Sequence, residues 1–293
     1  MERPTKLGLS HSNPASPGDA RPTALQVIKD EAVVGKLAGK VISALDGILE
    51  RERVGLVELD NTSLASVRAA AEAILQKSNG QVNVLVNNAG IMALPKLEHT
   101  KDGFEMQFGV KHLGHFLLFE LLKPALLASS GPEFSSRVVN VSSSAHNVAS
   151  INESGNYNFE KTEYNDWISY GQSKTANIYM ANEIERRYGS RGLHATSIHP
   201  GLIAMAEAFK KDEKAYKLMK SPEQGAATTV WAAISQEWEK KGGECLAECG
   251  KTTRGNDNHE IIGVGFAAHA YDAEKEARLW KDPLKMVGLT DDQ

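Results

Sequence analysis

The chain has few cysteines and no long hydrophobic run. Its two cysteines, Cys245 and Cys249, are too few for a disulfide framework or for a metal site built from cysteine ligands. No stretch of about eighteen apolar residues occurs, and residues 1–20 lack the apolar core of a secretory signal peptide. We therefore expect no membrane span, no metal site and a cytoplasmic location, because a reducing compartment is the default for such a chain.

The sequence also lacks an excess of charge of one sign. The formal net charge is −4, and the 33 Lys and Arg residues are interspersed with the 37 Asp and Glu residues. A surface that binds nucleic acid needs a basic stripe or patch, and the sequence shows none. We expect no nucleic acid as a partner.

Length and composition indicate one α/β domain preceded by a tail. The 293 residues, of which 41% are hydrophobic, can bury a substantial core. Residues 1–23 are rich in Pro, Ser, Gly and Asn, which predicts a disordered arm. The domain is then expected over residues 24–293.

Local patterns predict the main helices and strands. Thr62 or Ser63 can cap a helix that runs to Gln76, and Asp102 can cap a helix that runs towards Pro124. The second helix has a surplus of apolar residues, which fits packing against a partner subunit or packing inside a monomer. The other predicted elements are helices over 166–188, from 221 onward and over 271–284, and strands over 54–59, 82–86, 137–141 and 193–198. The amphipathic segment 271–284 is expected to pack against a second subunit rather than to contact a membrane.

Tyr170 and Lys174 lie four residues apart in the predicted helix 166–188. Positions i and i+4 share one face of a helix, so both side chains can point into one site. A free tyrosine titrates near pH ~10, and a neighbouring ammonium favours the phenolate. An ordinary exposed pair would show the same spacing. The Tyr170 and Lys174 spacing indicates a catalytic site only if other segments of the sequence support it.

Two predicted strands upstream end in polar turns. Residues 82–86 lead into Asn87-Asn88-Ala89-Gly90, and residues 137–141 lead into three serines. In an open parallel sheet, ligands lie beyond the carboxyl ends of the strands, so both turns belong at one edge. Asx-turn and serine-turn chemistry explains either segment alone. Both turns together with the Tyr170 pair favour a binding site.

Together, these segments resemble the short-chain dehydrogenase/reductase family, nearest its retinol-dehydrogenase-like and WW-domain-oxidoreductase-like branch. The resemblance covers roughly residues 54–290. It rests on Asn87–Gly90, His112-Leu113-Gly114-His115-Phe116, Val141-Ser142-Ser143-Ser144-Ala145-His146, Tyr170 and Lys174 with Ala176-Asn177, and His199-Pro200-Gly201. It implies a Rossmann-like, doubly wound parallel sheet in a single domain. It also implies an oxidoreductase that transfers hydride between NADP(H) and a carbonyl or secondary alcohol of an apolar small molecule, with NAD(H) not excluded. A homo-oligomer is a further possible assembly.

The resemblance also implies roles for single residues. Tyr170 would be the general acid/base, Lys174 would lower its pKa and bind the nicotinamide ribose, and Ser143 would polarise the substrate carbonyl. The residues that would bind the cofactor, besides Tyr170 and Lys174, are Asp60 near the adenine ring, Asn87, Asn88, Ala89 and Gly90 on the adenosine side, and Pro200, Gly201 and Ile203 beside the nicotinamide.

The start of the domain departs from the family pattern. The family begins with a strand, a Thr-Gly-x-x-x-Gly-x-Gly turn, a helix and a second strand. Here the strand-like residues 37–42 are followed by eleven residues before Val54, and Gly47 is the one glycine among them. A βαβ unit needs roughly 30 residues. The sequence therefore predicts a truncated N-terminal βαβ unit, without the turn that meets the pyrophosphate and without the strand end that selects NAD or NADP.

Two single positions also depart from the family. Lys111 stands where the family has its active-site asparagine, which removes a residue that relays water and kinks the helix. Met205 stands where the family has a threonine that contacts the cofactor. Two classes of function therefore stay open. One is an active oxidoreductase, and the other is a catalytically impaired or inactive, truncated member that acts through its subunit interface.

Overall fold

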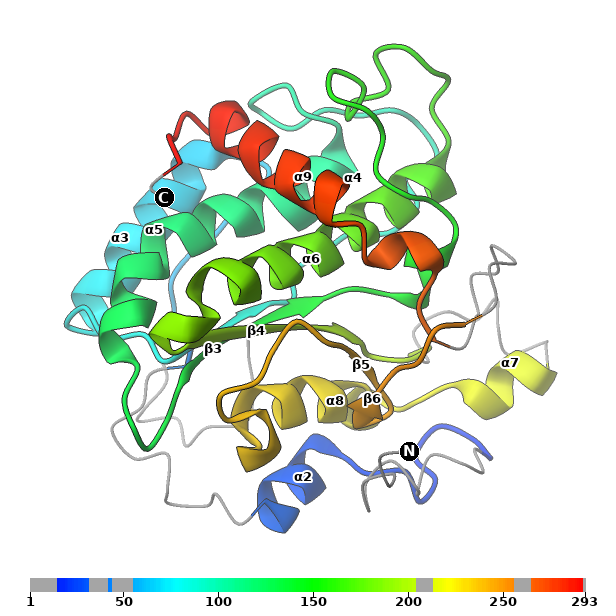
Figure 1. The fold of residues 1–293 in the computed structure, drawn as a ribbon. Coiled ribbons are helices and arrows are strands. Elements are labelled where there is room, and N and C mark those ends of the chain that lie inside the picture. The colour runs from blue at the N-terminus through cyan, green and yellow to red at the C-terminus, as the bar shows by residue number, and fades with distance from the viewer. Residues whose placement is uncertain (1–14, 32–41, 44–54, 204–212, 256–264, 292–293) are drawn as a thin grey trace.

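The computed structural model describes residues 15–31, 42–43, 55–203, 213–255 and 265–291. The strands in these ranges form one six-stranded sheet in the order β1-β2-β3-β4-β5-β6 (Figure 1). They are β1 (Ile42–Ser43), β2 (Val84–Asn87), β3 (Ser136–Val141), β4 (Leu193–His199), β5 (Cys245–Ala247) and β6 (Gly250–Lys251). Strands β1 to β5 run parallel, and β6 is antiparallel to β5.

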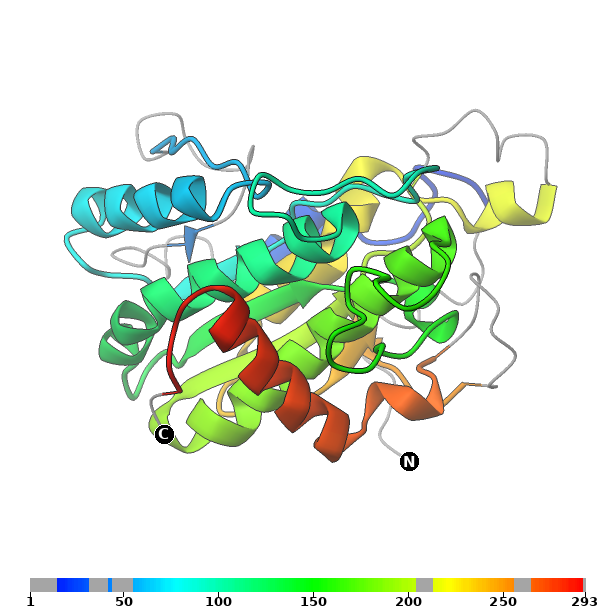
Figure 2. The same ribbon diagram turned by 90° about the horizontal axis from the view of Figure 1, so that it is seen from above.

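Helices cover both faces of this sheet (Figures 1 and 2). One face carries α3 (Leu64–Lys77), α4 (Met106–Phe108), α5 (Gly114–Ser129), α6 (Asp166–Tyr188) and α9 (Ala273–Met286), and the other carries α2 (Ala24–Asp30) and α8 (Pro222–Ile234). The short α7 (Glu213–Leu218) precedes α8. Successive strand residues point to opposite faces, so Leu85 joins the core beneath α5 whereas Val84 joins the core beneath α8. The doubly wound, single-domain α/β architecture is confirmed. None of the helices in the described ranges is both long and apolar enough to cross a membrane.

Several predicted element ends are confirmed, because they depend on local chemistry. Ser63 caps α3 by accepting the N–H of Ser66. Ser221 and Gln224 form a reciprocal capping box at the start of α8. Helix α6 begins at Asp166 and ends at Tyr188, as predicted. Gly189 follows the last helical residue, and Gly192, with φ 82°, adopts the left-handed conformation three residues later.

The strand predicted over residues 54–59 is wrong over its described part. Val54 lies outside the described residues, and residues 55–59 have no regular secondary structure. The place beside β2 in the sheet is taken by Ile42–Ser43. An apolar run forms a strand only where a neighbouring backbone accepts its hydrogen bonds, and residues 55–59 have no such neighbour among the described strands.

The cap predicted at Asp102 is also wrong. The Glu105 carboxylate accepts the N–H groups of Gln107 and Phe108 and so begins α4. Asp102 instead accepts the N–H of Leu64 at 2.7 Å, at the start of α3. A carboxylate can serve any exposed helix start within reach, so its sequence position alone does not identify the helix that it caps.

Part of the predicted disordered arm is held against the domain. Arg21 is 4% exposed, and its guanidinium donates to the carbonyls of Leu218 and Met219. Gln224 accepts the N–H of Gly18 and donates to the Asp19 carboxylate. Residues 15–23 thus contact the end of α7 and the start of α8, although residues 1–14 lie outside the described ranges. The composition of the segment did not reveal the buried Asp19–Arg21 pair, which anchors it.

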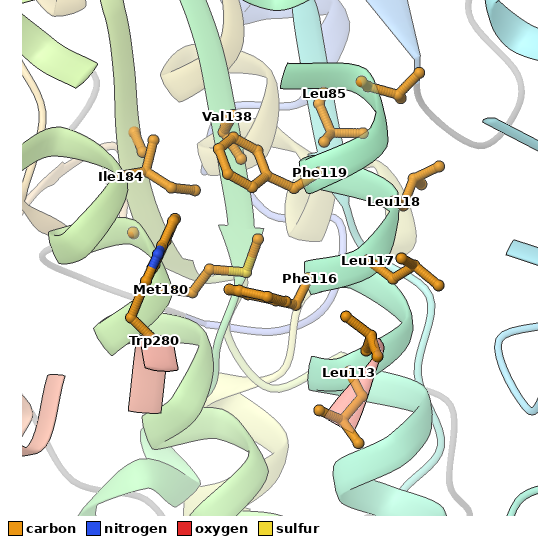
Figure 3. Close-up of a cluster of buried hydrophobic side chains, with 14 of the residues drawn as sticks. Leu85, Leu113, Phe116, Leu117, Leu118, Phe119, Val138, Met180, Ile184 and Trp280 are labelled. Carbon is orange, nitrogen blue, oxygen red and sulfur yellow. The ribbon is translucent and has the colours of Figure 1, made fainter. Parts of the chain in front are cut away.

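Helix α9 covers the apolar side of α5 and α6 within the same chain (Figures 1 and 2). Trp280 is 2% exposed, and its ring lies 5.2 Å from Phe116 and 6.0 Å from Phe119, centroid to centroid (Figure 3). The surplus of apolar residues on α5 is therefore explained by packing inside one chain. The amphipathic segment expected to face a second subunit packs against its own domain instead.

Replacing Trp280 by alanine should lower the free energy of unfolding by about 3–5 kcal/mol, as for other large aromatic side chains removed from cores. Urea unfolding followed by circular dichroism measures this loss. Lys281→Ala changes the exposed neighbour on the same helix and should alter the free energy by less than about 0.5 kcal/mol. Equally small losses in both variants would contradict the packing of α9 on α5.

Four histidines of the core and site should make the protein sensitive to acid: His112, His115, His146 and His199. Burial and the nearby His115 lower the pKa of His112 to about 3. The unfolded chain binds this proton near pH ~6.5, so stability falls as the pH drops below that value. At pH 5, one such histidine should cost about 2 kcal/mol.

His112→Phe should remove that part of the acid sensitivity, because the ring lies between Phe108 and Phe116 and phenylalanine has a similar shape. Urea midpoints at pH 7 and pH 5 should differ less in this variant than in the parent. The exposed His99, changed to Gln, is the control and should leave the difference as it is. Identical pH dependence in His112→Phe and the parent would refute the expectation.

Candidate active site

The carboxyl ends of β2 and β3 bring the two predicted polar turns together. Asn87 and Asn140 are paired in register, and the Asn87 side-chain amide donates to the Asn140 side chain at 2.8 Å. Asn87 is buried, whereas Asn88 and Gly90 are exposed and Ala89 is half-buried. The Asn87–Gly90 turn therefore presents backbone to solvent at the edge of the sheet where parallel α/β domains bind ligands.

Helix α6 is joined to the end of β3 at the residues predicted to be catalytic. The Lys174 ammonium donates to the Val141 carbonyl at 2.9 Å, and the Ser142 hydroxyl donates to the Lys174 carbonyl at 2.8 Å. Asn177 also donates to the Val141 carbonyl, at 3.0 Å. These bonds fix the position of α6 along β3. Tyr170, one helical turn before Lys174, therefore lies beyond the end of the strand.

Ser143 and Tyr170 meet at that point. Ser143 caps the short 3₁₀ turn Ser144–Asn147, and its hydroxyl hydrogen-bonds with the Tyr170 side chain. Burial raises the pKa of Tyr170, and the bond with Ser143 offsets only part of this rise. The half-buried phenol therefore stays protonated at neutral pH, with part of its surface open to solvent.

Lys174 lies beside Tyr170 in the structure. Its ammonium is 5.6 Å from the centroid of the tyrosine ring. The Lys174 side chain is itself buried, and burial lowers its own pKa to about 8. Desolvation thus acts on both groups against their charged forms. The structure brings Ser143, Tyr170 and Lys174 together, and the expected lowering of the Tyr170 pKa by the lysine stays a prediction.

His146 holds the serine turn, a function that the sequence motif did not reveal. Its Nε2 accepts the N–H of Ala267 at 3.2 Å, so Nδ1 carries the proton and donates to the Ser143 carbonyl at 2.6 Å. Burial lowers the pKa of His146 to about 4, which keeps the ring neutral. The imidazole thereby connects the segment after residue 265 to the backbone of Ser143. In the sequence, the only indication of this role was that His146 follows Ser143 by three residues.

The Pro200-Gly201 turn lies next to the serine turn. The Ser144 N–H donates to His199 Nδ1 at 3.1 Å, at the end of β4. Gly201 has φ 93°, and a Cβ atom there would lie 2.8 Å from the Lys220 side chain, so only glycine fits. The Lys220 N–H donates to the Leu202 carbonyl at 2.7 Å, and Ile203 forms a β-bridge with Lys220. Met205 lies outside the described residues. The turn predicted to flank the nicotinamide is therefore at the same edge as Ser143.

Asp60 lies in a separate, exposed corner. Its carboxylate accepts the N–H and the hydroxyl of Thr62 and forms an ion pair with Lys101 at 2.8 Å. The hydrogen bond from Lys101 is the main cause that lowers the pKa of Asp60 to about 2. The contacts described for Asp60 do not join it to the catalytic trio. Its predicted place near the adenine ring stays a prediction.

Lys111 occupies an unexpected position in the site. The expected loss of the helix kink is wrong, because Gly109–Leu113 forms a π-helical turn between α4 and α5. The Lys111 side chain is fully buried, and its ammonium lies 3.0 Å from Gln107 Oε1 and 3.9 Å from the centroid of the Tyr170 ring. Sequence reasoning identified the substitution but not Gln107, which lies one helical turn earlier.

A shallow hollow of about 430 Å³ lies away from these groups. Its lining includes Ser130, Ser135, Arg191, His194 and Lys240. His194 and Ser135 belong to the amino ends of β4 and β3, opposite the edge that carries Tyr170. The hollow does not bear on the chemistry of the trio.

Comparisons with known proteins agree with this geometry. The short chain dehydrogenase family matches residues 23–217. The chain is 45% identical to the short-chain dehydrogenase/reductase prx1 of Penicillium roqueforti, over 94% of this chain and 93% of that protein. It is 34% identical to human retinol dehydrogenase 13, over 79% and 68% of the two chains. A protein of Mycobacterium paratuberculosis described as uncharacterized has a similar structure, with a TM-score of 0.59, 33% identity and coverage of 80% and 75%.

The match to prx1 spans almost the full length of both proteins, and the family match covers more than half of this chain. The family uses a nicotinamide dinucleotide as cofactor, and the relatives bear the names of dehydrogenases and reductases. The chain therefore belongs to the short-chain dehydrogenase/reductase family of oxidoreductases, near its retinol-dehydrogenase-like branch.

Proposed function

We propose that the chain catalyses NADP(H)-dependent hydride transfer between nicotinamide and the carbonyl or secondary alcohol of an apolar small molecule. The observation that carries this proposal is the convergence of Ser143, Tyr170 and Lys174 at the carboxyl end of β3. A hydroxyl, a phenol and an ammonium at one point suit proton transfer to an oxygen atom of a substrate.

The described residues fit the nicotinamide and ribose end of the cofactor. Lys174 uses one of its three donors on Val141, which leaves two for ribose hydroxyls. The Asn87 side-chain oxygen is buried and has no hydrogen-bond partner among the described residues. Gly201 presents backbone beside the serine turn. The cofactor would supply the hydride, and these residues would bind and orient it.

The chain's own residues would manage the proton. In reduction, the Ser143 and Tyr170 hydroxyls would donate hydrogen bonds to the carbonyl oxygen, and Tyr170 would then transfer its proton to that oxygen. Because burial raises the pKa of Tyr170, the phenol is in its acid form at neutral pH, as reduction requires. In oxidation, the phenolate must act as the base. The oxidation rate should therefore rise with pH towards the pKa of Tyr170.

Exposed apolar side chains near the site support an apolar substrate. Met92 is 56% exposed and Ile168 is 40% exposed. The segments that carry them are joined by a hydrogen bond from the Tyr164 hydroxyl to the Leu94 carbonyl at 2.9 Å. Trp167, three residues before Tyr170 on α6, packs against the Tyr170 ring with 5.9 Å between the centroids. An apolar ligand placed against these rings would bury apolar surface, which favours binding by the hydrophobic effect.

The remaining parts of the proposal depend on the resemblance and on composition. The preference for NADP(H) over NAD(H) follows from the resemblance to the retinol-dehydrogenase-like branch. The cytoplasmic location is proposed from the low cysteine content. A small-molecule carbonyl or alcohol is the proposed binding partner, and a homo-oligomer stays a prediction.

Titration with NADPH and NADH tests the first requirement of this function. We expect binding of both, tighter for NADPH, reported by nicotinamide fluorescence. Lys174→Met removes the ribose donors and should weaken binding, whereas Lys281→Met removes an exposed ammonium on α9 and should not. A cooperatively folded protein that binds neither nucleotide would contradict the proposal and favour the inactive, truncated form.

Tyr170→Phe tests the second requirement. Loss of the phenolic proton should reduce kcat for carbonyl reduction by at least about 10²–10⁴-fold, the usual contribution of general acid catalysis. The dissociation constant for NADPH and the urea midpoint should stay close to those of the parent. Tyr188→Phe removes a hydroxyl from the same helix, far from the trio, and should keep its activity. Retained turnover in Tyr170→Phe would remove Tyr170 from its role.

A further inference from the structure

Lys111 is among the largest fully buried side chains of the described residues. It lies in the middle of the π-helical turn Gly109–Leu113. Its aliphatic stem packs on the backbone of Gly90, where a Cβ atom would lie 3.3 Å from the Lys111 Cγ. The stem therefore runs between the π turn and the Asn87–Gly90 turn, and the charged end lies inside the site.

The ammonium of Lys111 has two near neighbours of different kinds. Gln107 Oε1 accepts from it at 3.0 Å, and the face of the Tyr170 ring is 3.9 Å away, measured to the centroid. Burial lowers the pKa of Lys111 well below its usual range, repulsion from Lys174 lowers it further, and attraction to Glu105 offsets part of this shift. One amide oxygen and one aromatic face offset only part of the solvation free energy that a buried ammonium loses. A negative charge on the Tyr170 ring would stabilise the ammonium further.

Gln107 is held so that its oxygen faces Lys111. Its Oε1 also accepts the Ala93 N–H at 2.9 Å, and its Nε2 donates to the Asp166 carbonyl at 2.9 Å. These two bonds fix the orientation of the side-chain amide. Gln107 is fully buried, so the oxygen that directs Lys111 towards the ring cannot turn to solvent.

Tyr170 consequently has two ammonium groups close to its ring, Lys111 at 3.9 Å and Lys174 at 5.6 Å from the centroid. A cation beside an aromatic ring is attracted by the ring electrons, and the attraction grows when the ring carries the charge of a phenolate. Water does not screen this attraction at a fully buried ammonium. The family's asparagine at this position would contribute no charge.

We propose that Lys111 is a second cation that stabilises the phenolate of Tyr170 and so sets the pH range in which this residue exchanges its proton. This inference builds on the proposed function, because it assumes that Tyr170 is the acid/base. Lys111 acts through Tyr170 and need not touch substrate or hydride, so it is a positioning residue.

Several other titratable groups lie around Lys111 and Tyr170. Glu105 and Lys174 interact with Lys111, His115 and His199 interact with Lys174, and the Tyr164 hydroxyl accepts from Gln107 Nε2 at 3.2 Å. Burial lowers the pKa of His115 to about 4 and that of His199 to about 3, so both are neutral near pH 7. Neither histidine therefore adds a charge beside Tyr170 and the two lysines near pH 7.

Titration of the tyrosinate absorbance tests the proposal without any turnover. The chain has seven tyrosines, so the signal of Tyr170 is obtained by subtracting the same titration of the Tyr170→Phe variant in each background. Lys111→Met keeps the length of the side chain and removes the charge. We expect it to raise the midpoint of Tyr170 by about one pH unit or more, which corresponds to about 1.4 kcal/mol.

Two comparisons separate this effect from a structural role. Lys111→Arg keeps a cation and should keep most of the parent midpoint, and Lys281→Met, on the exposed side of α9, should leave it unchanged. Gln107 Oε1 retains the Ala93 N–H in Lys111→Met, so no buried acceptor is orphaned and the urea midpoint at pH 7 should not fall. Equal Tyr170 midpoints in the parent and in Lys111→Met, or equal shifts in the Met and Arg variants, would overturn the proposal.

The kinetic counterpart is the pH dependence of alcohol oxidation. With Lys111→Met, the rise of kcat with pH should move to higher pH by the same interval as the absorbance midpoint, while the KM for the alcohol changes little. If the absorbance shifts and no variant turns over substrate, the proposed function fails and the role of Lys111 stands. If turnover occurs and neither profile shifts, the role of Lys111 fails alone.

Discussion

The geometry of the site depends on the hydrogen bonds between helix α6 and the end of strand β3. The Val141 carbonyl accepts from both Lys174 and Asn177, and Ser142 donates to the Lys174 backbone. A buried carbonyl left without these donors would be costly, so the helix cannot slide along the strand without losing several bonds at once. The position of Tyr170 beyond the strand end follows from this constraint. The Lys174 side chain, which would bind the ribose, thus also fixes the position of α6 along β3.

Burial of this attachment explains the unusual electrostatics around Tyr170. Removing water raises the pKa of the phenol and lowers the pKa of both neighbouring lysines, because each charged form loses solvation. The cost of one charge falls when the opposite charge forms beside it. The phenol and the ammonium groups therefore titrate as a coupled set, and the protonation of Tyr170 is a property of the set rather than of the Tyr170–Lys174 pair alone.

Features set by nearby residues could be predicted from the sequence, whereas features set by distant partners could not. The Ser63 and Ser221 caps and the ends of α6 depend on a few adjacent residues. The strand expected over 54–59 failed because a strand needs a neighbouring backbone, and the Asp102 cap failed because the carboxylate reaches another helix. The convergence of Ser143, Tyr170 and Lys174 was predictable through the family resemblance. The place of Lys111 over Tyr170 was not, since it depends on the rotamer of Gln107.

The N-terminal departure bears on binding more than on chemistry. Residues 43–53 contain a single glycine, and the match to prx1 spans 323 positions although this chain has 293 residues, so the alignment places gaps in this chain. A turn that meets the pyrophosphate contacts a group that does not react, and its interactions are about equal in the ground state and the transition state. If this turn is missing, as the sequence predicts, nucleotide affinity should be weaker while the proton transfer at Tyr170 stays intact. A family member can in this way retain the chemical step and still need a high concentration of cofactor to show it.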